Sequence, residues 1–413
     1  MSKMKLPDGW KYIKLSELFD EESEKNHSNI EVLTIVQGVG TVPRKDSGRD
    51  IIYDKNSLSN YKYVQKDDFI IHLRSFEGGL EIANQEGIVS PAYIILRTKI
   101  QAEPGYLYAL FHSNRFINQT MAPAVEGVRD GRTVKYEVLK NQYIPFPPLS
   151  EQKKIAEILY KQDKLILFKQ KLLEQKQQQK KWLIKKLLEV PHTNADCEKV
   201  FSLGGVVIDK SGWKKEILGR ICTITGRIGF RGYTRSDITS SDKGVLSLSP
   251  SNIIDGQLNM EDSTFITLEK YLESPEIMIQ KHDIVFVKTG STFGKVGYLD
   301  SIYQKATINP QLVIVRSNNL VRQNLLYYIL KSDYFQNFVN KIVVGGAVPT
   351  LSQEQLSKIM IHLPTLTEQE IIAQVLSAAD KEIALLKSII EQEKQKKKSL
   401  AQLLLTGTVR VKT

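Results

Sequence analysis

The feature that most constrains the fold of this chain is an internal repeat. The segment Pro147-Pro-Leu-Ser-Glu-Gln-Lys-Lys-Ile-Ala returns as Pro364-Thr-Leu-Thr-Glu-Gln-Glu-Ile-Ile-Ala, an offset of 217 residues, the difference between 147 and 364. The register then runs without a gap for about forty positions, which chance similarity between two helices rarely achieves. A weaker upstream match, Gly9-Trp10 against Gly212-Trp213, extends the repeat beyond the helices. One structural plan is therefore used twice.

The repeat predicts an α+β fold, in which two mixed α/β globular domains are each followed by a long helix. The expected divisions are a first globular domain at 1–148, a helix at 149–190, a linker at 191–210, a second globular domain at 211–363, a helix at 364–406 and a tail at 407–413. Within the domains, β-rich apolar runs predict strands at Phe69–Leu73, Tyr93–Arg97, Ile284–Lys288 and Leu312–Arg316. Aromatic helices are expected at Tyr106–Phe116 and Leu325–Val339.

The two long helices carry apolar residues at heptad spacing, which is typical of a coiled coil. The helix-pairing candidates are Leu159, Ile166, Leu173, Leu183 and Leu187 in the first helix and Leu376, Ile383, Leu386, Ile390, Leu400 and Leu404 in the second. Polar residues interrupt this seam at matching places, Lys176 and Lys180 against Glu393 and Lys397. These four residues are either simply solvated or face each other or another protein.

The length of these helices has a geometric consequence. About 40 residues at 1.5 Å per residue extend roughly 60 Å. An antiparallel pair of this length acts as a rigid spacer that places the two globular domains at opposite ends. The separation exceeds the roughly 34 Å of one turn of B-DNA, so the pair allows two DNA sites with a gap between them.

The net charge of +11 and the pI near 9.2 favour a polyanionic partner. The excess is uneven, because residues 1–148 contain 19 basic and 19 acidic residues whereas residues 149–190 contain 11 and 5. A DNA-binding first domain therefore needs a local basic patch. Basic residues among Gly, Ser and aromatic residues in loops suit phosphate contacts and base readout. The DNA-binding candidates chosen on this basis are Arg44, Lys45, Arg49, Arg74, Ser75, Arg129, Arg132, Arg227, Arg231, Arg235, Lys288, Thr289, Ser291 and Lys295.

Motifs for catalysis or for a bound cofactor are not found in the sequence. The six histidines are scattered without zinc-ligand spacing. The glycine-rich loop at 290–295 is one residue short of a phosphate-binding loop, and Val296 stands where that motif needs Ser or Thr. Two cysteines, Cys197 and Cys222, fit a reducing cytoplasm, and no apolar run is long enough to span a membrane. We expect a cytoplasmic reader with no catalytic residue, metal or cofactor of its own.

The pattern resembles the specificity subunits of type I restriction-modification systems over essentially the whole chain. The resemblance rests on the two repeated segments, on the C-terminal Leu404-Leu-Thr-Gly-Thr-Val-Arg-Val, and on the domain starts Leu6-Pro-Asp-Gly-Trp and Ser211-Gly-Trp. The first helix departs from the family pattern, because it ends in Leu188-Glu-Val-Pro and lacks the Thr-Gly-x-Val-Arg ending. The loop at Pro349-Thr350 matches Arg132-Thr133 only loosely.

This resemblance implies that each globular domain is a target recognition domain that reads one half of a bipartite target in double-stranded DNA. The helix pair would set the spacer and dock two methylation subunits, which bring S-adenosylmethionine. Restriction subunits using ATP and Mg²⁺ would join further out. Two alternatives remain: a specificity subunit of a solitary methyltransferase without a nuclease partner, and a non-DNA scaffold with a basic coiled coil.

Overall fold

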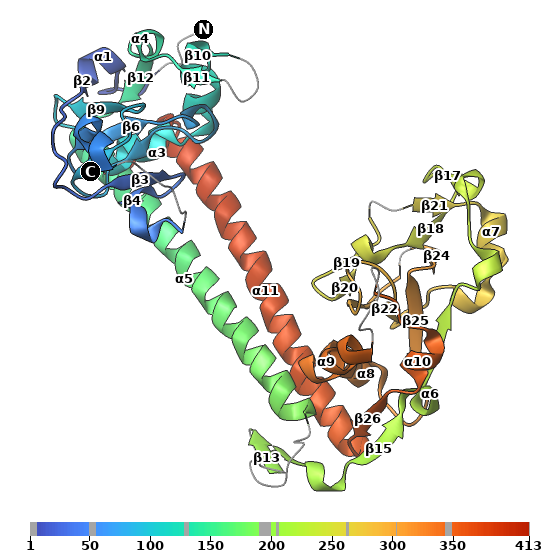
Figure 1. Cartoon of the computed structure of the whole chain (residues 1–413). Helices are drawn as coiled ribbons and strands as arrows, with labels where there is room; N and C mark the ends of the chain where they lie inside the picture. Colours follow the sequence, from blue (N-terminus) through green and yellow to red (C-terminus); the bar gives the residue numbers. More distant parts are fainter. Residues whose placement is uncertain are drawn as a thin grey trace. The chain divides into compact units, whose positions relative to one another are not determined.

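The computed structural model describes residues 6–48, 55–127, 132–189, 200–203, 206–261, 264–302, 304–342 and 349–412 (Figure 1). The chain divides into two compact units. Unit 1 comprises Met1–Lys171 and Lys387–Thr413, and unit 2 comprises Leu172–Leu386. The two long helices, α5 (Leu149–Leu188) and α11 (Leu366–Leu405), are 40 residues each and contribute to both units. Each unit thus combines a globular domain with part of the helix pair.

The globular part of unit 1 is built on short antiparallel strands. Its largest described sheet has the order β2-β9-β6-β7, namely Phe19–Glu22, Ile94–Thr98, Phe69–Ile71 and Glu81–Ile82. The other strand pairs are β1 (Lys11–Lys14) with β12 (Tyr143–Phe146), β3 (Leu33–Val36) with β4 (Gly40–Pro43), β5 (Lys62–Val64) with β8 (Gly87–Val89), and β10 (Val125–Glu126) with β11 (Thr133–Val134). The helices are α1 (Leu15–Leu18), α2 (Ser75–Gly78), α3 (Pro104–Phe111) and α4 (Tyr136–Leu139). Buried aromatic residues of α3 pack on this sheet, as the sequence predicts for a core helix.

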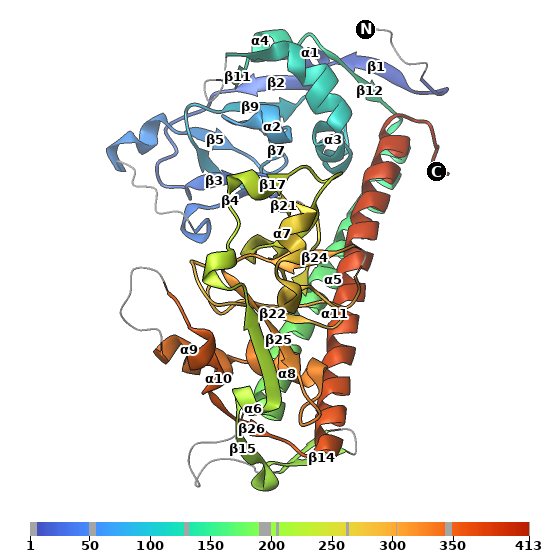
Figure 2. The same cartoon turned by 90° about the vertical axis from the view of Figure 1, so that its right-hand side faces the viewer.

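The globular part of unit 2 repeats this plan with additional strands. Among its described residues the largest sheet has the order β16-β25-β22-β23-β20-β19, namely Cys222–Gly226, Leu312–Ser317, Ile284–Val287, Val296–Tyr298, Gln257–Leu258 and Ile253–Ile254. A second sheet contains β17 (Ile238–Thr239), β21 (Thr264–Ile266), β18 (Val245–Leu248) and β24 (Ala306–Ile308). The helices are α6 (Leu218–Ile221), α7 (Leu268–Leu272), α8 (Gln323–Lys331), α9 (Asp333–Ile342) and α10 (Gln353–Ser357). The strands β15 (Lys214–Ile217) and β26 (Met360–Leu363) pair beside the start of α11 (Figure 2).

A buried glutamine anchors the first turn of each long helix to its globular domain. In unit 1 the amide of Gln152 accepts a hydrogen bond from Glu103 N at 2.9 Å and donates to Pro147 O at 2.9 Å. In unit 2 the amide of Gln369 accepts from Arg322 N at 2.9 Å and donates to the backbone carbonyl of Pro364 at 3.0 Å. Both amides satisfy backbone groups that burial would otherwise leave unpaired. The same anchor therefore recurs at the 217-residue offset.

The two long helices pair antiparallel in each unit. In unit 1, Asp163 of α5 meets Lys397 of α11 at 2.5 Å. In unit 2, Lys176 of α5 meets Glu382 of α11 at 2.7 Å, and Lys180 meets Asp380. Within unit 2, rising numbers along α5 accompany falling numbers along α11. The predicted α+β fold, with two mixed domains and an antiparallel pair of long helices, is confirmed.

The predicted helix seam corresponds to the inner face of the pair. Eight of its eleven leucines and isoleucines are buried in the structure: Leu159, Ile166, Leu183, Leu187, Leu376, Ile383, Ile390 and Leu404. The other three, Leu173, Leu386 and Leu400, are half-buried. Leu159 and Leu404 pack into the core of the first globular domain, so the helix ends belong to that core.

The polar interruptions of the seam face the opposite helix. Glu393 accepts hydrogen bonds from Gln162 at 2.7 Å and from Lys169 at 3.1 Å. The ammonium group of Lys180 pairs with Asp380, whose carboxylate also accepts from the Tyr328 hydroxyl of α8 at 2.7 Å. These residues therefore meet partners on the other helix, and Lys176 and Lys180 pair elsewhere than with Glu393 and Lys397.

The segment predicted as a linker, 191–210, contains two short strands among its described residues. Strands β13 (Val200–Leu203) and β14 (Val206–Asp209) form an antiparallel ladder, and Phe201 and Ile208 pack against the end of α5. The buried Lys210 donates from Nζ to the backbone carbonyls of Lys186 in the last turn of α5, at 2.6 Å, and of Glu189 just after the helix, at 2.5 Å. A cation at this position satisfies the helix's last carbonyls and complements its dipole.

The C-terminal tail folds back onto unit 1. Arg410 pairs with the buried Glu151 in the first turn of α5, and Glu151 also accepts from Trp10 Nε1 at 3.2 Å. Gly407 ends α11 with φ of +73°, and a Cβ there would lie 2.5 Å from Pro7 Cγ. Only glycine suits both that backbone conformation and that close approach.

Candidate nucleic-acid interface

An ion pair between a buried aspartate and a partly exposed arginine lies at the same end of the main sheet in each unit. In unit 1 both guanidinium contacts of Arg97 to Asp68 are short, 2.9 and 2.7 Å. In unit 2 Arg316 contacts Asp283 in the same bidentate way, at 2.7 Å for both contacts. Such planar, doubly bonded pairs hold strand ends in a defined geometry. The predicted DNA-binding residues that follow β6 and β22 lie at the other end of these sheets.

In unit 1, three candidates gather around the short helix α2. Arg74 precedes α2 and is exposed, whereas Ser75 is buried and its hydroxyl accepts from His72 N at 2.8 Å. Arg132, from a distant segment, stacks its guanidinium over the Phe76 ring at 4.4 Å. Ser75 thus shapes the turn, and the two arginines present charge beside it.

Two further unit 1 candidates lie just after β4. Arg44 donates to the Tyr61 hydroxyl at 3.5 Å, and Lys45 forms an exposed ion pair with Glu31 at 2.8 Å. The hydrogen bond and the charge of Glu31 raise the pKa of Lys45. Arg49 and Arg129 lie outside the described residues.

In unit 2, four candidates share the turn between β22 and β23. Lys288 and Thr289 follow β22, exposed Ser291 stands in the turn, and Lys295 precedes β23. Thr289 forms a β-bridge with Thr350, which brings a distant segment to this turn. In unit 1, Arg132 approaches α2 in the same way. The loops at Arg132-Thr133 and Pro349-Thr350, which match only loosely in sequence, therefore lie at equivalent places in the two units.

The arginine cluster of unit 2 separates into a buried and an exposed part. Arg227 is only 4% exposed and donates to Ile308 O at 3.2 Å and Thr307 Oγ1 at 3.2 Å. Burial lowers the pKa of its guanidinium, although the group also stacks over Tyr233. Arg231 is half-buried and donates to Glu273 O at 3.0 Å, whereas Arg235 is exposed. Arg227 is therefore a structural residue in this conformation, and Arg235 is the accessible member.

Each long helix also leaves large apolar side chains uncovered among the described residues. On α5, Tyr160 and Leu167 are exposed and Phe168 is 65% exposed. On α11, Leu385 is 61% exposed, and it matches Phe168 at the 217-residue offset. The charge pattern of the sequence did not point to Phe168 and Leu385. The 217-residue offset relates the two residues once their exposure is known. The same position of the repeat is therefore apolar and exposed in both long helices.

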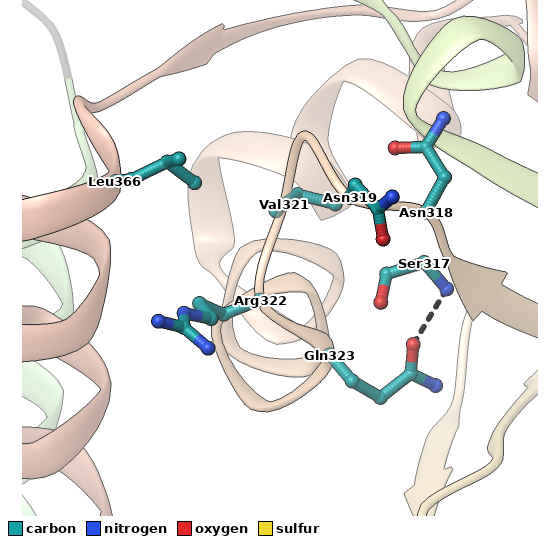
Figure 3. Close-up of a pocket in the computed structure, with 7 residues that line it drawn as sticks. All are labelled: Ser317, Asn318, Asn319, Val321, Arg322, Gln323 and Leu366. Atoms are coloured by element: carbon teal, nitrogen blue, oxygen red, sulfur yellow. Dashed lines mark hydrogen bonds between the residues drawn. The ribbon is translucent and has the colours of Figure 1, made fainter.

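A pocket of about 440 Å³ lies where the loop after β25 meets the start of α11. Figure 3 shows Ser317 N donating to Gln323 Oε1, a contact of 2.6 Å. Arg322 at its rim pairs with Glu370 at 3.3 Å, and Asn318 donates to Arg220 O at 2.6 Å. The polar groups of this pocket hold the loop in place, which gives the pocket a structural role.

The part of the chain that the structure describes contains no cluster of metal-binding side chains. There, no three His, Cys, Asp or Glu side chains are grouped to bind a metal ion. None of the described helices is both long enough and apolar enough to cross a membrane.

Comparison with known proteins identifies relatives over the full length. A family model for the type I restriction modification DNA specificity domain matches residues 7–177 and again 211–395. The type I restriction enzyme MjaVIII specificity subunit of Methanocaldococcus jannaschii is 26% identical over 432 residues, covering 100% of this chain and 96% of that protein. The HsdS subunit structure from Thermoanaerobacter tengcongensis gives a TM-score of 0.52 at 18% identity over 99% of both chains. A structure described for complex assembly and conformational transition of the type I R-M system gives 0.62 at 16% identity, over 98% of this chain and 100% of that one. At such identities these structures show a shared fold.

Proposed function

The chain belongs to the type I restriction modification DNA specificity family, and from this premise we propose that it reads a bipartite DNA target, one half-site per globular domain. The helix pair sets the spacer between the half-sites. The chain itself catalyses no reaction and directs the enzymatic subunits of a type I complex to their site.

The observation that carries this proposal is the recurrence of one anchored unit. The Gln152 and Gln369 anchors show the same domain-to-helix attachment twice, and the two Asp–Arg pairs show the same contact within the main sheet twice. The loops at the other sheet end differ, since α2 occupies in unit 1 the place of the β22–β23 turn in unit 2. A common scaffold with different loops suits two domains that read different sequences.

The accessible basic side chains support contact with DNA. Among the described residues, the side chains of Arg74, Arg235, Lys288 and Lys295 make no ion pair, so their charges are available to phosphates. The buried Arg227 supports the loop from beneath. Phosphate contacts of this kind position a domain, and neighbouring polar side chains then read bases.

The matched exposed residues Phe168 and Leu385 support docking of two copies of one partner. We assign these positions to two methylation subunits, which supply S-adenosylmethionine as the methyl donor. Restriction subunits that use ATP and Mg²⁺ join the assembly through them. The alternatives, a solitary methyltransferase complex or a scaffold without DNA, lack an observation of their own.

Exchange of one globular domain tests the proposal. The chain is co-expressed with its partner subunits, and methylated motifs are mapped across the host genome. Replacing residues 1–148 by the corresponding domain of a relative should change one half-site and leave the other half-site and the spacer unchanged. The reciprocal exchange of residues 211–363 is the matched control and should change the other half-site. Changes in both half-sites from one exchange, or absence of any bipartite motif, would refute the proposal.

A further inference from the structure

A glutamine that the charge pattern did not select lies among the basic residues of unit 2. Gln311 stands between β24 and β25, directly after Pro310, and its side chain is exposed. Its carbonyl oxygen accepts from Lys288 N at 2.9 Å, which places it beside the β22–β23 turn. The same sheet end carries Lys288 and Thr289. Gln311 is therefore in the part of the domain that we assign to DNA.

The side chain of Gln311 is held in place by its neighbour. Asn309 is 8% exposed and donates from Nδ2 to Gln311 Oε1 at 3.1 Å, while its own Oδ1 accepts from Gln311 N at 3.0 Å. On the opposite side, Gly290 has a φ of +113° and a Cβ there would lie 3.1 Å from Gln311 Nε2. The amide is thus fixed between a buried asparagine and a glycine turn.

This arrangement leaves both parts of the amide able to bind a base. The oxygen has a second lone pair beyond the one that Asn309 uses. The Nε2 group donates to no described residue, and it carries two hydrogens. A glutamine amide that offers one acceptor and one donor is complementary to N6 and N7 of adenine in the major groove. A side chain already fixed before binding also loses little conformational entropy.

The first domain offers a different group at the equivalent place. There the sequence reads Ser90-Pro91-Ala92, and Ala92 N donates to Ser90 Oγ at 3.3 Å. Alanine has no amide with which to read a base edge. The scaffold therefore carries a reading group at this position in one domain only, as expected if the half-sites differ.

We propose that Gln311, positioned by Asn309, reads one adenine in the half-site of the second domain through its N6 and N7 edge. This inference rests on the proposed function and adds the base class and the residue that recognises it. Oε1 accepts from the adenine amino group, and Nε2 donates to N7.

The test is a double-mutant cycle on DNA binding by the chain in complex with its methylation subunits. The mapped target is synthesised with 7-deazaadenine at each adenine of the second half-site in turn, on either strand, which removes the N7 acceptor. Wild-type affinity should fall by about 2- to 13-fold at one position, since one of the two hydrogen bonds is lost. Gln311→Ala should bind more weakly and show no further loss at that position.

Two variants separate recognition from folding. Gln311→Glu keeps the acceptor for Asn309 and removes the donor to N7, so it should also be insensitive to 7-deazaadenine. Gln304→Ala removes an exposed glutamine of the same unit and should keep the wild-type sensitivity. All three variants should unfold at the wild-type temperature, because the altered side chains are exposed.

Full sensitivity in Gln311→Ala, or a wild-type protein insensitive at every adenine, would overturn the assignment of Gln311. In either case a wild-type complex that still methylates a bipartite motif leaves the proposed function standing. Failure of the wild-type complex to bind or methylate any bipartite target would instead refute the proposed function itself.

Discussion

Shortening both long helices by one heptad tests whether the helix pair sets the length of the spacer between the half-sites. The deletion removes Gln170–Lys176 from α5 and Leu386–Gln392 from α11, which leaves the proposed docking residues Phe168 and Leu385 in place. Lys169 then occupies the helical position of Lys176, and Ile383 that of Ile390, so the seam continues in register. The ion pairs Asp163–Lys397 and Lys180–Asp380 lie outside the deleted segments and are retained.

The magnitude follows from helix geometry. Seven residues at 1.5 Å each shorten the pair by about 10.5 Å. Seven residues are close to two turns, so the residual rotation is only about 20°. At about 3.4 Å per base pair, the spacer between the half-sites should shorten by about 3 base pairs.

Genome-wide mapping of methylated motifs measures this change directly, with the variant co-expressed with its partner subunits. Both half-sites should stay as in the wild type, because neither globular domain is altered. Deletion of the heptad from α5 alone is the control and should abolish methylation, since it puts the two helices out of register. An unchanged spacer in the double deletion, or an altered half-site, would refute the proposal that the helix pair sets the spacer length.

Three further changes test the packing. Gln369→Leu should lower the free energy of unfolding by about 1–3 kcal/mol, because Arg322 N loses its buried acceptor; urea denaturation measures this, and an unchanged midpoint contradicts it. The pKa of Glu393 is lowered by hydrogen bonds from Gln162 and Lys169, so its carboxylate stabilises the pair above the unfolded pKa and this contribution is lost as the pH falls through the folded pKa. Glu393→Gln should therefore melt with less acid dependence than the wild type in circular dichroism, and equal dependence would argue against the contact. Lys210→Met should speed amide hydrogen exchange in the last turn of α5, by about 2 kcal/mol in opening free energy, and unchanged protection there would show that the cap is dispensable.

The helices were predictable because their information is local and repeated. Heptad spacing identified the inner face, and the 217-residue register located both starts at a Pro-containing segment. The partners of the polar residues were not predictable, because pairing depends on how the helices are staggered. Hence Lys180 pairs with Asp380, whereas the heptad pattern alone set it against Glu393 and Lys397.

The missed hairpin β13–β14 shows a different limit. The sequence does contain a hairpin signal, two apolar runs separated by Gly204-Gly205. A two-stranded hairpin is only marginally stable alone. Its stability here comes from Phe201 and Ile208 packing on α5, a contact that no local pattern reveals.

The interface was predictable by region and not by residue. Arg227 and Lys288 are both basic residues beside glycine-rich turns, and the sequence predicts DNA contact equally for both. Their fates differ because β24, some 80 residues beyond Arg227, supplies the carbonyl and hydroxyl that bury the guanidinium. Gln311 was not selected because no basic residue stands beside it in the sequence, although it follows Pro310 as Ala92 follows Pro91 in the first domain.

Unit 1 is formed from two separate segments of the chain, which the ribosome synthesises at different times. Its core includes Leu404 and Leu405, yet 215 residues of unit 2, Leu172–Leu386, are made between its two segments. At roughly 5–20 residues per second, the first domain waits about 10–40 s before its last helix arrives. During this interval the apolar residues that pack against Leu404 and Leu405 lack these partners. The contacts of Gly407 with Pro7 and of Arg410 with Glu151 thus form only after the whole of unit 2 has been synthesised.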